Sequence, residues 1–113
     1  TQDFINIRAE SFKKRRDFVV DSLNNIKGLS CLRPEGAFYV FPNCKKLLGK
    51  KTKLKTDKDF VEKLLEKSEV AVVQGSAFGL NGYFRISYAT SMENLKKAME
   101  RIKSFCDNLI RIS

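Results

Sequence analysis

The stretch Val70–Ser91 reads VAVVQGSAFGLNGYFRISYATS and carries the strongest local signals in the chain. Its first four residues form a short apolar run typical of a buried strand, and the glycines that follow predict a connecting loop. From Tyr83 to Tyr88, aromatic and β-branched residues alternate with polar ones, which predicts a second strand. The alternation places Phe84 and Ile86 on one face of that strand and Arg85 on the other.

Arg85 is the residue in this stretch that most needs a chemical explanation. A guanidinium keeps its charge and is costly to bury without a partner, and its planar fork matches a carboxylate or phosphate through two parallel hydrogen bonds. Two interpretations stay open from the pattern. Arg85 binds an anion, or it lies on the solvated face of an edge strand and pairs with a surface acid.

Length and composition predict one domain that spans residues 1–113. A chain of 113 residues with 42% hydrophobic content can bury one core. The net charge of +9 affects solubility and the electrostatic steering of charged ligands, and it says little about function. The chain opens at Thr1 with an uncapped amphipathic segment, so we expect it to be cut from a longer protein.

The cysteines and the hydropathy pattern narrow the function classes. There are three widely spaced cysteines and no histidine, which argues against a zinc site and for reduced thiols in a cytosolic protein. No apolar run approaches the roughly 20 residues of a membrane span. We therefore expect a soluble, cytoplasmic protein without a membrane partner or metal.

Helical spacing of apolar residues predicts helices over about 4–26, 56–68 and 90–109. The first contains the basic cluster Lys13–Arg16, interpreted as a solvated face, and ends before Gly28. The other two each begin with a threonine followed three residues later by a carboxylate, the pairs Thr56–Asp59 and Thr90–Glu93. The last helix has the most regular apolar stripe, namely Leu95, Ala98, Met99, Ile102, Phe105, Cys106 and Leu109.

The remaining segments predict strands and one long loop. Residues 29–33 and 37–41 are interpreted as a hairpin whose turn is Pro34–Gly36. Residues 44–55, with six lysines, are interpreted as a mobile surface loop. The predicted order is helix, strand, strand, helix, strand, strand, helix. Short connections between strands favour antiparallel pairing, so the fold class is α+β, with a small antiparallel sheet of about four strands covered by helices.

Three blocks carry a resemblance to a known family, and they occur in its order. The blocks are Arg33–Val40 (RPEGAFYV), Val70–Gly79 (VAVVQGSAFG) and Tyr83–Ser91 (YFRISYATS), the last with Glu93–Leu95. Together they resemble the C-terminal part of class I/II aminotransferases of fold type I, above all the bacterial aspartate/prephenate subgroup. Three ordered blocks are far more specific than any single glycine pattern.

The resemblance implies an enzyme that uses pyridoxal 5'-phosphate to move an amino group between an amino acid and a 2-oxo acid. It implies that Arg85 holds the α-carboxylate of the substrate and that Phe38 lies beside the substrate. Gly36 and Gly75 are similar to turn glycines that let these strands approach the site. The family is usually dimeric, so the full-length protein is expected to be a homodimer.

The departures from the family pattern set limits on this chain. Gln74 stands where the family usually has proline. The Schiff-base lysine, the aspartate that pairs with the pyridine nitrogen and the phosphate-binding residues lie upstream in such enzymes. The chain thus resembles the small C-terminal domain alone, with no catalytic or cofactor-binding residue of its own. We expect it to be inactive by itself.

Two alternative functions stay open at this point. Residues 81–88 partly resemble the RNA-recognition strand in which exposed aromatics stack on bases, and the net charge suits RNA. Two defining positions fail, because Phe84 occupies a small-residue site and Arg85 an aromatic one. The other alternative is a docking domain with no site, in which Arg85 would have no role in activity.

Overall fold

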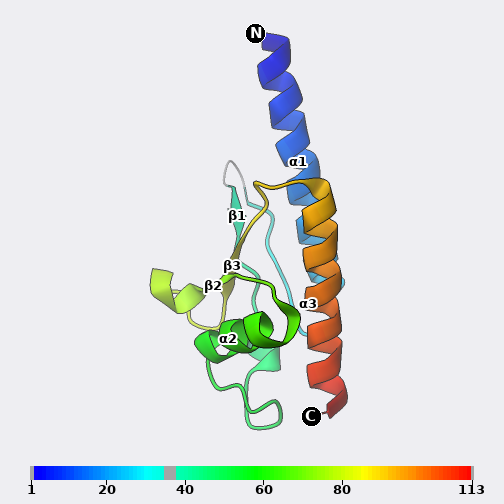
Figure 1. The fold of residues 1–113 in the computed structure, drawn as a ribbon. Helices are drawn as coiled ribbons and strands as arrows, with labels where there is room; N and C mark the ends of the chain where they lie inside the picture. Colours follow the sequence, from blue (N-terminus) through cyan, green and yellow to red (C-terminus); the bar gives the residue numbers. More distant parts are fainter. Residues whose placement is uncertain (1, 35–37, 113) are drawn as a thin grey trace.

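The computed structural model describes residues 2–34 and 38–112, and Figure 1 shows their arrangement. Two long helices lie side by side, and a small sheet and a shorter helix lie along one side of the pair (Figure 1). The chain measures 53 × 27 × 21 Å along its principal axes. Its elements in chain order are α1 (Gln2–Asn24), β1 (Tyr39–Val40), η1 (Lys45–Leu47), α2 (Asp57–Ser68), β2 (Val73–Gln74), η2 (Gly75–Phe78), β3 (Phe84–Ser87) and α3 (Met92–Ile112).

The sheet has three antiparallel strands in the order β1-β3-β2. Tyr39 pairs with Ser87 across β1 and β3, and Val73 pairs with Arg85 across β2 and β3. The central position of β3 confirms that the stretch Val70–Ser91 organises the sheet. The α+β class and the antiparallel pairing are confirmed, with three strands where about four were predicted.

The predicted hairpin of residues 29–33 with 37–41 does not form in the described residues. Ser30 makes an isolated bridge with Asn43, and β1 pairs with β3 instead. The side chain of Asn24 explains this, because it accepts a bond from the Cys31 nitrogen (2.8 Å) and donates one to the Cys31 oxygen (2.9 Å). The backbone of Cys31 is thus satisfied by α1, whereas Ser30 exchanges both of its backbone bonds with Asn43 in the isolated bridge. Most of the predicted turn, including Gly36, lies outside the described residues.

The alternation predicted for residues 83–88 is confirmed. Phe84, Ile86 and Tyr88 are buried, whereas Arg85 is half-buried and Ser87 is exposed. The strand predicted for residues 70–73 forms later than expected, at Val73–Gln74, while Val70 is buried without strand pairing. Sequence alone gives the apolar run but does not say which of its residues lies opposite β3.

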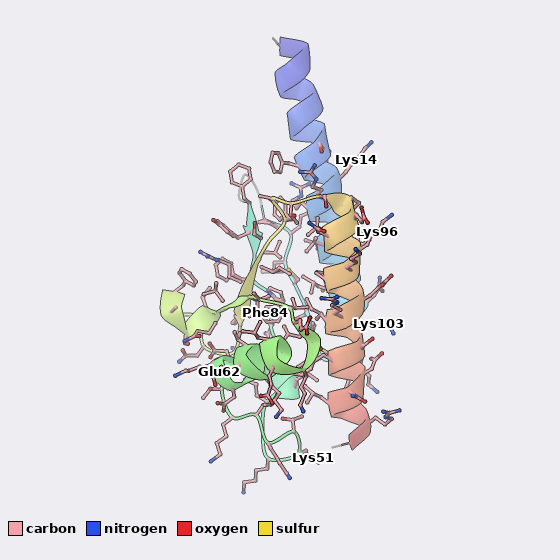
Figure 2. All side chains as sticks on the ribbon, in the orientation of Figure 1. Lys14, Lys51, Glu62, Phe84, Lys96 and Lys103 are labelled. Atoms are coloured by element: carbon pink, nitrogen blue, oxygen red, sulfur yellow. The ribbon has the colours of Figure 1, made fainter. Side chains whose placement is uncertain are left out.

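The core lies between the sheet and the helices α1, α2 and α3. Phe60 of α2 stacks on Phe84 of β3 with ring centroids 5.2 Å apart, and it meets Phe105 of α3 edge-on at 5.4 Å. Figure 2 shows Phe84 in the middle of the molecule, while Lys14, Lys96 and Lys103 project outward from the long helices. The predicted α3 stripe is confirmed, since all of its members are buried except the partly buried Ala98.

The helix boundaries follow the predicted caps closely. Thr56 and Asp59 form the predicted capping box at the start of α2. At the start of α3 the prediction was wrong by one residue. The backbone nitrogen of Asn94 donates to the hydroxyl of Ser91 (3.1 Å), so Ser91 caps the helix and Thr90 does not. Helix α1 ends at Asn24, and Gly28 lies in the turn beyond it with a φ of +95°.

The lysines of both basic segments are exposed, as predicted, but the stretch of residues 44–55 also buries Leu47 and Leu54, and its mobility stays a prediction. In the α1 cluster Lys13 and Lys14 are exposed, whereas Arg16 is half-buried and pairs with Asp17 (3.1 Å). The lysine-rich stretch after Cys44 contains η1 and a bridge between Gly49 and Leu54, and Figure 2 shows Lys51 at its outer tip. No helix in the described part of the chain combines the length and the apolar run that crossing a bilayer requires.

Candidate functional site

Arg85 occupies the middle of the central strand, on the sheet face opposite the core. Its guanidinium carbon lies 4.3 Å from the centroid of the Tyr39 ring and 4.7 Å from that of the Phe78 ring. Tyr39 comes from β1 and Phe78 from η2, so elements on either side of β3 supply the two rings. Cation–π attraction to both rings favours this position of the guanidinium.

The charge of Arg85 has no acidic counterpart among the described residues. Its interactions there are with the two aromatic rings, and no carboxylate lies within ion-pair distance. The interpretation of an edge strand with an Arg85 surface ion pair is therefore wrong for this structure, because β3 is central and no described acid pairs with it. A held guanidinium with unused donors can receive an anion.

Phe38 lies one residue before β1 and has a different environment. Its ring packs against Phe12 of α1 at 5.1 Å between centroids, and 51% of the residue is exposed. The structure brings Arg85 together with Tyr39, the next residue along, because successive side chains of a strand point to opposite faces. The substrate contact expected for Phe38 stays a prediction.

Gly75 lets the loop between β2 and β3 close tightly. Its nitrogen donates to the Tyr83 oxygen at 2.7 Å. A Cβ at this position would lie 2.6 Å from the same oxygen and would also collide with the Leu80 oxygen. A larger residue would therefore displace the loop that carries Phe78. This agrees with the turn role expected for Gly75.

Asp57, the first residue of α2, anchors the same loop from the other side. Its carboxylate accepts backbone bonds from Ser76 (2.9 Å) and Gly82 (3.2 Å), and the residue is 2% exposed. Burial would raise the pKa of Asp57, but the bonds from Ser76 and Gly82 outweigh it and hold the pKa below its usual value. Asp57 is thus an anion satisfied by N–H donors.

Sequence reasoning placed Asp57 within the start of a helix and assigned it no further role. A signal was present, because Asp57 precedes Phe60, Val61 and Leu64 at helical spacing and so falls on the buried stripe of α2. A charged residue on such a stripe predicts a buried partner. The two rings beside Arg85 were also missed, because their approach depends on strand pairing and on the loop.

The cysteines do not contribute a nucleophile. All three are buried and free. Burial raises the pKa of Cys31 to about 11 and the pKa of both Cys44 and Cys106 to about 12, so the thiols stay protonated at neutral pH. Within the part of the chain that the structure describes, no group of three possible ligands could hold a metal ion.

Comparison with known proteins identifies the class of protein to which this chain belongs. A family model described as "Aminotransferase class I and II" matches residues 1–102. The chain belongs to this family.

Two individual relatives show how similar the chain is to curated members of this family. It is 58% identical over 112 residues to an aspartate aminotransferase of Rhizobium meliloti (strain 1021), and 50% identical over 112 residues to a probable aspartate/prephenate aminotransferase of Rickettsia felis. In both cases the match covers 96% of this chain and 27% of the relative. The chain therefore spans little more than a quarter of the length of these curated relatives.

Solved structures of aminotransferases have the same fold as this chain. The crystal structure of the aspartate aminotransferase from Rhizobium meliloti superposes with a TM-score of 0.90 at 58% identity, covering 95% of this chain and 28% of that one. An alanine aminotransferase from Pyrococcus furiosus superposes with a TM-score of 0.86 at 35% identity, covering 96% and 27%. Family membership favours the aminotransferase interpretation over the RNA-binding alternative.

Proposed function

We propose that this chain is the C-terminal domain of a pyridoxal-phosphate-dependent aminotransferase, and that Arg85 binds the α-carboxylate of its amino-acid and 2-oxo-acid substrates. The names of the relatives support an aspartate aminotransferase, with the aspartate/prephenate type as a close variant. A cytoplasmic homodimer is part of the same proposal.

The observation that carries the proposal is the geometry of Arg85. A carboxylate presents two oxygens in one plane, which the guanidinium fork can meet with two charge-assisted hydrogen bonds. Tyr39 and Phe78 hold the guanidinium before a substrate arrives. Ordering a free arginine side chain costs roughly 1.5–2 kcal/mol, so this arrangement reduces a cost that substrate binding would otherwise bear.

Carboxylate binding by Arg85 would serve orientation rather than bond breaking. A two-point contact fixes the direction of the Cα substituents, and correct orientation alone can supply a large part of a rate enhancement. Arginine suits this role better than lysine, because an ammonium binds as a point charge and leaves the carboxylate free to rotate.

The described residues around Arg85 do not fit the cofactor itself. The side chains that contact Arg85 are those of Tyr39 and Phe78, and both are aromatic. The amine of Lys45 lies over the Tyr83 ring instead, 5.1 Å from its centroid. Neither a Schiff-base lysine nor an aspartate for the pyridine nitrogen stands among these contacts. We therefore assign the cofactor to the remainder of the enzyme, where it would supply the electron sink for amino transfer.

Steady-state kinetics of the complete enzyme with Arg85→Lys and Arg85→Ala test the proposal. Removing a charged hydrogen bond costs about 1.5–3 kcal/mol, so kcat/KM for both substrates should fall roughly tenfold to 150-fold, with KM raised by the lost binding and kcat lowered by the lost orientation. Arg101→Ala, at an exposed position of α3, is the matched control and should leave both constants unchanged. Unchanged kinetics for the Arg85 variants would instead support a docking domain with no site.

A further inference from the structure

The loop that connects β2 to β3 is held at both ends by one carboxylate. Asp57 Oδ2 accepts from the Ser76 nitrogen and Oδ1 accepts from the Gly82 nitrogen, across sequence separations of 19 and 25 residues. Of the charged side chains that the structure describes, Asp57 is the one that is buried, and no described cation pairs with it. Its two bonds therefore fix the loop to the start of α2.

Phe78 lies between those two anchor points. The segment turns tightly, since the Gly79 nitrogen donates to the Ser76 oxygen (3.1 Å) and the Leu80 nitrogen donates to the Gly75 oxygen (2.9 Å). Phe78 leaves this turn with its ring over Arg85 and edge-on to Phe41 at 5.9 Å between centroids. The ring is 46% exposed, so core packing alone does not determine where it lies.

We propose that Asp57 is a positioning residue for the substrate carboxylate: by fixing the loop from Ser76 to Gly82 it sets the place of Phe78, which sets the orientation of Arg85. The inference rests on the proposed function of Arg85. Asp57 does not touch the guanidinium, so its effect must pass through the loop and the Phe78 ring.

The test uses the complete enzyme with Asp57→Asn, Phe78→Leu and the double variant, assayed well below the unfolding temperature of each. Asparagine keeps the shape but replaces one accepting oxygen with a donor, so one of the two backbone bonds is lost. Each single variant should raise KM for both substrates, roughly threefold to tenfold, with a smaller change in kcat. The double variant should raise KM no more than the stronger single variant, because both changes act on one path.

Asp59→Asn is the matched control. It removes an acid from the same helical turn and weakens the capping box, but it does not contact the loop. It should lower the unfolding temperature and leave KM unchanged. A loss of stability without a change in KM is what a merely structural role for Asp57 would produce.

The outcomes separate this inference from the function on which it rests. If the Arg85 variants leave KM unchanged, the proposed function fails. If they raise KM but Phe78→Leu does not, or if the Asp57 and Phe78 effects multiply independently, only the positioning role is overturned. An Asp57→Asn enzyme that fails to fold also overturns it, because Asp57 would then support the whole domain rather than one loop.

Discussion

Replacing Gln74 with proline should stabilise the chain. Gln74 has a φ of −62° and a ψ of 136°, and proline fixes φ near −65°. The residue before it, Val73, lies in a strand, and an extended conformation is what a following proline requires. Because β2 is an edge strand of the described sheet, a proline there need not interrupt a ladder.

The register shows which backbone nitrogen is free. Gly75 donates to Tyr83, and hydrogen-bonded pairs alternate along antiparallel strands, so Val73 with Arg85 is a bonded pair and Gln74 with Phe84 is not. The Gln74 N–H therefore points away from β3, and proline removes no ladder bond. Restricting the unfolded chain should then contribute about 0.4–1 kcal/mol, or a rise of about 2–5 °C in Tm.

Val73→Pro is the matched control, one residue away. It removes a ladder donor and leaves the Arg85 carbonyl unpaired, which should cost about 1–3 kcal/mol and lower Tm by about 5–15 °C. Thermal unfolding of both variants and the parent chain, followed by far-ultraviolet circular dichroism, measures the two shifts. A Gln74→Pro chain that melts lower than the parent would refute the register argument, and equal losses in both variants would show that β2 is not paired as described.

Three further predictions concern acid stability, thiol reactivity and cofactor binding. Because the pKa of Asp57 is lower in the folded chain than its unfolded value near 3.9, its stabilising effect is present above that pH and is lost as the pH falls below it. In urea titrations the stability difference between the parent and Asp57→Asn should therefore shrink below about pH 4, and a constant difference would contradict the assignment. The buried thiols should not react with a disulfide reagent at pH 7.5 until urea unfolds the chain, when all three cysteines should react; rapid labelling of the folded chain would contradict their raised pKa values. Mixed with pyridoxal 5'-phosphate, the 113-residue chain alone should retain no coloured cofactor after gel filtration and show no transaminase activity, and turnover would contradict the assignment of cofactor residues to the rest of the enzyme.

The helices were predictable because their signals are local. Side chains three and four residues apart meet on one helix face, so the apolar stripe of α3 could be read directly from the sequence. The same holds for the Thr56–Asp59 capping box, which spans one turn. The start of α3 shows the limit of such patterns, since Thr90 and Ser91 both offer a hydroxyl and only the backbone conformation decides which of them caps the helix.

Strand partners were less predictable because pairing joins distant parts of the chain. Residues 29–33 have the composition of a strand, yet the side chain of Asn24 takes the backbone bonds of Cys31. With Cys31 bonded in this way, the pairing between residues 29–33 and the segment after β1 is limited to the single bridge of Ser30 with Asn43. The pairing of β1 with β3 depends on the whole fold, not on the sequence of the turn at Pro34.

The sequence by itself determined the family through three ordered blocks, the α+β class, the helices, and the exceptional position of Arg85 in an apolar strand. The tertiary structure decided that Tyr39 from β1 and Phe78 from η2 contact Arg85, and that Asp57 of α2 binds the loop that carries Phe78. The physical reason is the sequence separation over which each kind of interaction acts. Helix periodicity and strand alternation are set by neighbours a few residues apart, whereas the site joins elements whose approach is fixed when the core of Phe60, Phe84 and Phe105 packs.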